Sequence, residues 1–304
     1  MPSVFITGAS GYLGSAITRE LVGAGYSVTG LTRSQAGAAI VAANGGVPVR
    51  GSTDDLALVA QHASAADATI HTAFDHSWRD VPAACASDRA TIGAIGQALE
   101  GTGKTFLVSS VATLGALHPT FTEADEGGPG SANPRFFSER VAESFAAKGT
   151  RPVIVRIAPL VHGPDLADSS FFLTLLRRAK DAGFAATVGG GQSRWASVHV
   201  SDVASLFRAA LEKPGVEGQF ERYHAVGDNG LRTKDIVGAI AAGLGVPTKD
   251  LVGDEAVKHY GILGKLIALD NPVENAATVR QTGWAPTQPN VLEALRAGQY
   301  FDQL

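Results

Sequence analysis

Three glycines near the amino terminus have the spacing of a phosphate-binding loop. Gly8, Gly11 and Gly14 lie at intervals of three residues, after an apolar run and before apolar residues at helical spacing. In a strand–turn–helix unit the first glycine permits the turn, the second lets backbone approach a pyrophosphate, and the third lets the helix pack on the strand. The alternative is a glycine turn that packs a helix on a sheet without a ligand. We expect a dinucleotide site, which also includes the loop residues Ser10, Tyr12 and Leu13.

The end of the second predicted strand bears on the type of dinucleotide. An NAD enzyme usually has an Asp or Glu here to hold the ribose hydroxyls, and none is present at 31–34. Arg33 instead suits a 2′-phosphate, and the hydroxyls of Thr32 and Ser34 could donate to it. The alternative for Arg33 is an ordinary solvated arginine. The sequence therefore favours NADP over NAD.

The next strand ends carry further candidate residues. Ser52 and Thr53 follow the third strand, where they would meet the adenine edge or cap the following helix. Small residues after the fourth strand would let the cofactor backbone pass close by. The predicted cofactor residues there are Thr72, Ala73 and Phe74.

Beyond the fourth strand, three residues lie where a substrate pocket is expected. They are Asp75, His76 and Trp78. Their alternative role is that of ordinary loop residues. His71, inside the apolar strand, is interpreted as a core histidine with satisfied hydrogen bonds.

The elements that must position these residues alternate along the first half of the chain. Apolar strands are predicted at 3–7, 27–32, 47–50, 68–73, 104–109 and 152–157. Val- and Ile-rich strands separated by amphipathic helices indicate a parallel sheet covered on both faces. In such sheets, ligands bind beyond the carboxyl ends of the strands.

Composition narrows the class of protein. The 304 residues are 45% hydrophobic, with a net charge of −4 and one cysteine, Cys85. We expect no internal disulfide, no membrane span, no nucleic-acid partner and no metal site, since ligand spacing among the histidines is absent. The amino terminus enters a strand directly, so we expect a cytoplasmic protein without a signal peptide.

Several motifs in order resemble the short-chain dehydrogenase/reductase superfamily, in its extended or atypical branch. They include Thr7-Gly8-Ala9-Ser10-Gly11-Tyr12-Leu13-Gly14, Ile70-His71-Thr72-Ala73, Val108-Ser109-Ser110, Arg156-Ile157-Ala158-Pro159-Leu160-Val161-His162-Gly163-Pro164, Ser197-Val198-His199-Val200-Ser201-Asp202 and Thr282-Gly283-Trp284-Ala285-Pro286. The resemblance implies an α/β fold: a Rossmann-type doubly wound parallel sheet with a small C-terminal α/β substrate lobe. We expect a cofactor domain over 1–162, to which the chain returns around 196–222, and a substrate lobe mainly over 163–304.

The chain departs from the family at its catalytic residues. The family uses a Ser after the fifth strand, then a Tyr and, four residues later, a Lys. Ser110 matches the serine, but Arg135 and Glu139 stand at the Tyr and Lys positions; a register shifted by one gives Phe136 and Arg140. We prefer the first register, which keeps the 25-residue step from Ser110 to Arg135. The departure places this chain with an atypical subgroup that lacks the Tyr–Lys pair.

Arg135 cannot act as a general acid, but it can polarise a carbonyl. Glu139 could orient Arg135, replace the Lys at the ribose, or titrate if desolvated. The alternative is a surface i,i+4 ion pair of little consequence.

The resemblance implies further residues around the nicotinamide and the substrate. Pro159 and Val161 resemble residues that pack on the nicotinamide, and His162 replaces a common Tyr as an alternative proton carrier. His199 belongs to a signature that closes the second lobe onto the sheet, which is its preferred, structural role. The remaining candidates for the substrate pocket, besides His199, are Phe136, Phe137 and Trp195.

These observations lead to a functional expectation. We expect an NADP-dependent oxidoreductase of a small to medium, largely apolar carbonyl, imine or enone, with a proton from His162, His76 or water. The alternatives are a cofactor-bound enzyme without net redox, such as an isomerase, cyclase or dehydratase, and a non-catalytic NADP sensor. The protein would be a monomer or a homodimer formed through helices 82–100 and 134–148.

Overall fold

Seven parallel strands form the central sheet in the order β10-β6-β5-β4-β1-β2-β3. The computed structural model describes residues 1–304 except 113–119, 126–133 and 217. The strands are β1 Ser3–Thr7, β2 Ser27–Thr32, β3 Val47–Arg50, β4 Ala68–His71, β5 Thr105–Val111, β6 Arg151–Ile157 and β10 Glu221–Ala225. The strand order and the helices on both faces confirm the predicted Rossmann-type α/β fold.

The predicted strands agree closely with this sheet. The first three match residue for residue, whereas β4 ends at His71, two residues earlier than predicted, and β5 extends to Val111. Every residue of β4 and β6 is buried, as expected for strands covered on both faces. The seventh strand, β10, was missed because it joins the sheet only after the chain has left it for the second lobe.

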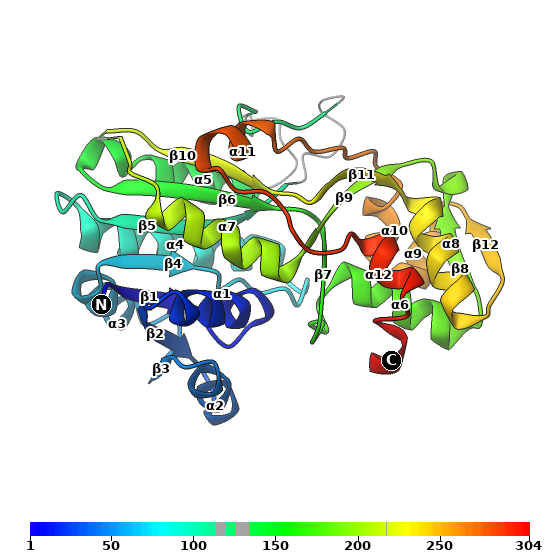
Figure 1. The fold of residues 1–304 in the computed structure, drawn as a ribbon, viewed down its shortest axis with the longest axis horizontal. Coiled ribbons are helices and arrows are strands. Elements are labelled where there is room, and N and C mark those ends of the chain that lie inside the picture. Colours follow the sequence, from blue (N-terminus) through cyan, green and yellow to red (C-terminus); the bar gives the residue numbers. More distant parts are fainter. Residues whose placement is uncertain (113–119, 126–133, 217) are drawn as a thin grey trace.

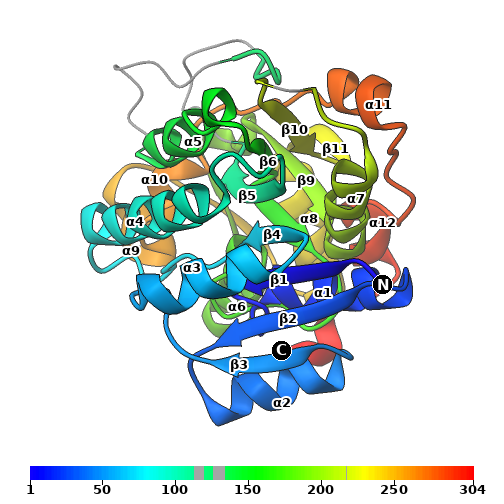
Figure 2. The same ribbon diagram turned by 90° about the vertical axis from the view of Figure 1, so that its left-hand side faces the viewer.

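Helices cover the two faces of the sheet. One face carries α3 Leu56–Ala65, α4 Val81–Leu99 and α5 Arg135–Glu143, and the other carries α1 Tyr12–Gly23, α2 Gln35–Ala43 and α7 Val200–Glu212 (Figure 2). No helix in the described ranges is long and apolar enough to cross a bilayer.

The second lobe lies beside the carboxyl ends of the sheet strands (Figure 1). Its strands are β7 Leu160–His162, β9 Arg194–His199 and β11 Asp228–Arg232 in one sheet, with β8 Ala185–Val188 and β12 Thr248–Leu251 paired separately. Its helices are α6 Phe171–Ala182, α8 Thr233–Leu244, α9 Asp254–Tyr260, α10 Leu263–Leu266 and α12 Val291–Arg296, whereas α11 Ala276–Thr282 packs beside β10. Thr233 is the first helical residue of α8, after Arg232.

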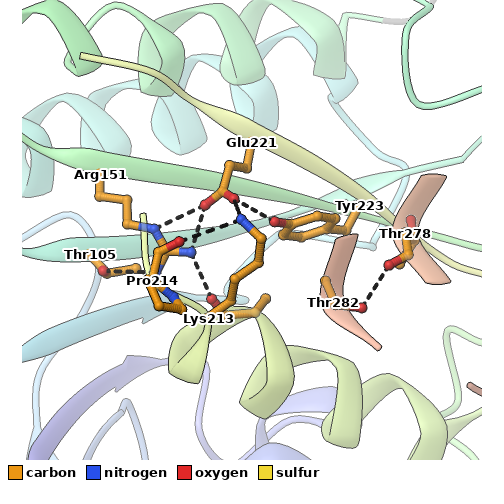
Figure 3. A network of polar contacts seen from close by, with 9 residues as sticks. Thr105, Arg151, Lys213, Pro214, Glu221, Tyr223, Thr278 and Thr282 are labelled. Atoms are coloured by element: carbon orange, nitrogen blue, oxygen red, sulfur yellow. Dashed lines mark hydrogen bonds and ion pairs between the residues drawn. The ribbon is translucent and has the colours of Figure 1, made fainter. Parts of the chain in front are cut away.

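A partly buried ion cluster fixes β10 against β6 (Figure 3). Arg151 donates to Glu221 over 2.9 and 2.6 Å, and Lys213 and Tyr223 bond to the same carboxylate. Burial alone would raise the pKa of Glu221, but the bonds from Lys213, Tyr223 and Arg151 hold that pKa below its ordinary value. The cluster anchors the returning chain at one edge of the sheet.

Candidate active site

The glycine loop between β1 and α1 leaves no space for a side chain at Gly8 or Gly14, and more space at Gly11. Gly8 has φ +73°, and a Cβ there would lie 2.8 Å from the Ala73 nitrogen. A Cβ on Gly14 would lie 2.1 Å from the Gly8 carbonyl oxygen. At Gly11 a Cβ would meet only that oxygen, at 3.2 Å. The loop therefore packs tightly against β4 and α1 while Gly11 stays exposed.

The amino end of α1 suits an anion. Gly11 is its N-cap, no side chain caps it, and its first turn carries no acidic residue. The Gly11 N–H donates to the Gly8 carbonyl, and the Ser15 N–H donates to the Gly11 carbonyl, so the N–H groups of residues 12–14 lie before the helical ladder begins. Together with the open side at Gly11, this end of α1 fits the diphosphate of a dinucleotide.

Three residues are predicted to meet a 2′-phosphate, and the hydroxyls of two of them make hydrogen bonds within the fold. Thr32 is buried, and its hydroxyl lies 3.1 Å from that of Ser10. Ser34 caps α2 by accepting from the Gly37 N–H. Arg33 and Ser34 are both exposed, and the Ser34 hydroxyl, which accepts this bond, can still donate to a phosphate.

Sequence reasoning missed Arg50, at the end of β3. Its guanidinium donates to the Arg33 carbonyl over 3.2 Å and to Gln35 over 3.1 Å. Parallel pairing aligns Arg50 with Thr32, which brings a second cation beside Arg33. A basic residue at the end of the neighbouring strand was the available signal.

The residues after β3 are held by local bonds. Ser52 bonds to Asp54 over 3.0 Å, and the Thr53 carbonyl accepts from Thr91. Asp55 caps α3, so the expectation that Ser52 or Thr53 caps this helix was wrong.

The end of β4 joins the glycine loop to a buried polar cluster. Thr72 donates to the Thr7 carbonyl over 2.9 Å. His71 is buried between Thr7 at 2.7 Å and Asp88 at 3.1 Å, which confirms its interpretation as a core histidine. Ala73 contributes the backbone that faces Gly8.

Ser110 and Glu139 share a hydrogen bond of 2.5 Å. Ser110 lies in β5 and donates to the carboxylate, which sits one helical turn into α5. Arg156 of β6 grips both oxygens of Glu139, over 3.0, 3.1 and 2.7 Å. All three side chains are buried. The i,i+4 alternative, a solvated surface pair, is therefore wrong for Glu139.

Arg156 belongs to one of the family motifs in the sequence, but no role was predicted for it. Its guanidinium also donates to the Asp125 carbonyl over 2.8 Å and lies over the rings of Phe121 and Phe136. Phe136 is consequently a core residue, 3% exposed, while its neighbour Phe137 is 43% exposed. Only Phe137 of these two predicted pocket residues faces solvent.

Arg135, the first residue of α5, lies between three elements. It donates to the Ser109 carbonyl over 2.7 Å, lies 3.3 Å from Asp88, and stacks 4.0 Å from the ring centre of Phe74. Burial would raise the pKa of Asp88, but the charge of Arg135 and the bond from His71 hold that pKa below its ordinary value. Asp88 thus stays an anion beside Arg135. Its position inside a helix gave no signal in the sequence for this role.

His162 faces the second lobe rather than solvent. It is 1% exposed, and its Nδ1 lies 2.8 Å from the Tyr300 hydroxyl. Burial, followed by the nearby His199, lowers the pKa of His162 to about 3. An imidazolium there is therefore disfavoured at neutral pH, which weakens its case as a proton donor. Pro159 and Val161, at the start of this segment, are half-buried.

Two other predicted substrate residues, His199 and Trp195, lie in different settings. His199 is half-buried and caps α7 by accepting from the Ser201 N–H. Together with His162 it lines a small cavity of about 80 Å³. Trp195 is 1% exposed, with its indole donating to the Leu269 carbonyl, so its placement argues against a substrate contact.

The loop after β4 remains at the surface. Asp75, His76 and Trp78 are exposed there. The bonds from Ser77 lower the pKa of Asp75, and the positive charge of Arg33 adds to this effect. No group of three or more His, Cys, Asp or Glu side chains in the described ranges could hold a metal ion.

Comparison with known proteins identifies relatives along the whole chain. Residues 4–225 match the NAD dependent epimerase/dehydratase family. An uncharacterized protein of Schizosaccharomyces pombe is 38% identical over 299 residues, which is 98% of this chain and 99% of that protein. An uncharacterized protein of Saccharomyces cerevisiae is 38% identical over 298 residues, covering 97% and 98%.

Solved structures share the fold at lower identity. A dTDP-glucose 4,6-dehydratase from Streptomyces venezuelae, solved with NAD, is 19% identical with a TM-score of 0.78, covering 99% of this chain and 97% of that one. A UDP-glucose 4-epimerase from Thermotoga maritima, solved with UDP-glucose, is 18% identical with a TM-score of 0.78, covering 99% of both. These findings confirm the resemblance to extended short-chain dehydrogenases/reductases: the chain belongs to the NAD dependent epimerase/dehydratase family.

Proposed function

We propose that the protein is an NADP-dependent oxidoreductase that reduces a small to medium, largely apolar carbonyl, imine or enone. The observation that carries this proposal is the placement of Arg135 at the carboxyl end of β5, where it donates to the carbonyl of Ser109, the residue before Ser110, in a chain with an intact glycine loop. A fixed cation at this edge suits the atom that gains negative charge during hydride transfer.

The preference for the 2′-phosphate is supported by two cations. Arg33 and Arg50 lie at neighbouring strand ends, and Arg50 donates to the Arg33 carbonyl. Residues 31–34 offer no carboxylate for a free ribose 2′-hydroxyl. Arginine recognises phosphate through paired N–H donors, so the two side chains would hold the phosphate between them.

The chain's own residues would divide the remaining work. Arg135 would polarise the acceptor atom, and Asp88 holds its guanidinium in place. Glu139 accepts the hydrogen bond that the Ser110 hydroxyl donates. This bond fixes the hydroxyl and leaves its lone pairs for a donor group of the substrate. The bound dinucleotide would supply the hydride. The proton would come from water or through His76, because His76 lies at the surface whereas His162 is buried.

Calorimetry with NADPH and NADH tests the cofactor half of the proposal. We expect tighter binding of NADPH, and an increase of about ten- to hundredfold in its dissociation constant in Arg33→Ala and in Arg50→Ala, with NADH unchanged. Arg280→Ala is the matched control, because this exposed arginine lies on α11 beside β10, at the opposite edge of the sheet. Equal affinities for the two nucleotides would refute the NADP preference.

A redox-neutral reaction is the second candidate. The family match favours it, and the carboxylate of Glu139 beside Ser110 could serve proton abstraction without net hydride transfer. This candidate predicts substrate conversion, detected by mass spectrometry, without a change in NADPH absorbance. Stoichiometric oxidation of NADPH by the same substrate would exclude it.

A further inference from the structure

Four aromatic side chains form a continuous row from the carboxyl end of β4 to the second lobe. We call Phe74, His76, Trp78 and Phe171 the aromatic row. Phe74 and His76 have ring centres 5.0 Å apart, and His76 and Trp78 are 6.0 Å apart. Trp78 stacks on Phe171, the first residue of α6, at 5.7 Å with 18° between the ring planes.

The row is anchored at both ends by buried groups. At its inner end the Arg135 guanidinium lies 4.0 Å from the centre of the Phe74 ring. At its outer end, the ring centre of Phe171 lies 6.2 Å from that of the buried indole of Trp195. The row thus leads from the cation proposed to polarise the substrate, across the surface, into the core of the second lobe.

Trp78 holds its place at a conformational cost. Its φ is +59°, a left-handed backbone that a bulky residue rarely adopts, and its side chain is 40% exposed. A strained backbone persists only where surrounding contacts enforce it, and such residues concentrate at ligand sites. Here the contacts are the rings of His76 and Phe171, so the strain serves the continuity of the row.

The row is largely uncharged beside Arg135. Desolvation, followed by the charge of Arg135, lowers the pKa of His76, which favours the neutral ring. The carboxylate of Asp75 accepts the Ser77 N–H over 2.8 Å, and Arg33 is the cation that acts on it. A ligand group that lies along this row meets aromatic faces and edges.

We propose that the substrate carries an aromatic ring, separated from its reacting carbonyl by a chain of several bonds, and that this ring packs against the aromatic row at Trp78. The proposal rests on the proposed function, since Arg135 would receive the carbonyl oxygen while the row receives the ring. Aromatic pairs gain from offset and edge-to-face contacts beyond the area they bury, which corresponds to about a two- to tenfold preference over a saturated ring of the same size.

Two matched aldehydes test the proposal. Phenylvaleraldehyde and cyclohexylvaleraldehyde, each with its ring on the terminal carbon, have the same chain length and an unconjugated carbonyl, and differ in the ring alone. With saturating NADPH, we expect kcat/KM to favour phenylvaleraldehyde by about two- to tenfold in the wild type. The preference should fall to about one in Trp78→Ala and in Phe171→Ala, and persist in Trp78→Phe.

Phe220→Ala is the control variant, because Phe220 is an exposed aromatic side chain that stacks with Arg222 at the far edge of the sheet. It should leave the preference unchanged. Thermal denaturation of each variant, measured in parallel, separates a lost ring contact from a lost fold. Equal kcat/KM for the two aldehydes in the wild type would overturn the aromatic substrate class and leave the reductase proposal standing.

Binding of two unreactive amides separates the two proposals. Phenylvaleramide and cyclohexylvaleramide, each with its ring on the terminal carbon, are added to the NADPH complex and followed by calorimetry. Tighter phenylvaleramide binding that Trp78→Ala abolishes would support the row even if neither aldehyde is reduced, in which case the reductase proposal fails alone. Equal binding of both amides, or a preference that survives Trp78→Ala and Phe171→Ala, would overturn the inference.

Discussion

Ser110 donates a hydrogen bond of 2.5 Å to Glu139, the residue that stands where the family resemblance implies a lysine. The serine is thereby tied to an anion, and the anion is neutralised by Arg156 from β6 instead of by a residue of α5. The site therefore has a cation, Arg135, at the position where the family resemblance implies a tyrosine, and an anion, Glu139, where it implies a lysine.

Replacement of Ser110 should separate catalysis from stability. In Ser110→Ala, Glu139 keeps its bonds to Arg156, so we expect unfolding free energy to fall by only about 0.5–1.5 kcal/mol. Loss of the hydroxyl that would accept a hydrogen bond from a substrate donor should lower kcat by up to about tenfold. Ser64→Ala, which removes an exposed hydroxyl on α3, is the control. Unchanged kcat in Ser110→Ala would remove Ser110 from the mechanism.

The Glu139–Arg156 pair should be costly to break on one side. Arg156→Met leaves a buried carboxylate without its main partner, and we expect a loss of about 3–5 kcal/mol in urea denaturation. The double variant Glu139→Met with Arg156→Met should be clearly more stable than Arg156→Met alone, because no buried charge remains. Additive losses in this double-mutant cycle would show that the pair contributes no coupling.

Two glycines of the loop should respond differently to alanine. Gly14→Ala would bring Cβ within 2.1 Å of the Gly8 oxygen, so we expect a loss of about 1–3 kcal/mol in stability. Gly11→Ala meets a single atom at 3.2 Å, and should fold normally while weakening NADPH binding by more than about tenfold. Gly23→Ala, with nothing within 4 Å, is the control. Tight NADPH binding by folded Gly11→Ala would contradict the loop assignment.

The buried His162 should make stability depend on pH. Burial lowers its pKa to about 3, from 6.5 in the unfolded chain, so the unfolded chain binds the extra proton between these values. Stability should therefore be complete above about pH 6.5 and fall as the pH drops toward 3. Replacement by Gln, which can still accept from Tyr300, should flatten this dependence by up to about 1.4 kcal/mol per pH unit.

Urea midpoints at pH 7, 6, 5 and 4 measure this difference between His162→Gln and the wild type. Both proteins keep other pH-dependent groups, including His224, whose pKa burial lowers to about 4. The informative quantity is thus the gap between the two curves. Parallel curves between pH 6 and 4 would contradict a neutral, buried His162.

The features that could be predicted from the sequence are those that depend on a local pattern of residues. Gly8, Gly11 and Gly14 carry their roles in their spacing, and the strands of the sheet are continuous apolar runs, so the fold class and the loop could be predicted. The satisfied state of His71 followed from its place in an apolar strand. These features need no knowledge of which distant segments meet.

The rest depends on contacts between segments far apart in the chain. Glu139 finds Arg156 only because α5 packs over β5 and β6, and Arg50 reaches Arg33 only because β2 and β3 pair in register. Thr32 has the right chemistry for a phosphate, but α2 covers it: a Cβ on Gly37 would lie 2.0 Å from its hydroxyl. The row from Phe74 to Phe171 joins two lobes and has no signature in either segment alone.

The position of β3 at the edge of the sheet has a consequence for how the protein responds to heat. Arg50 belongs to this strand, which in the described sheet pairs with β2 alone, whereas the glycine loop stands on the central β1. Edge strands open by local unfolding at lower free energy than central ones. Fraying of β3 on warming would withdraw Arg50 first, so the selectivity between the two nucleotides should decay at temperatures where the diphosphate is still held.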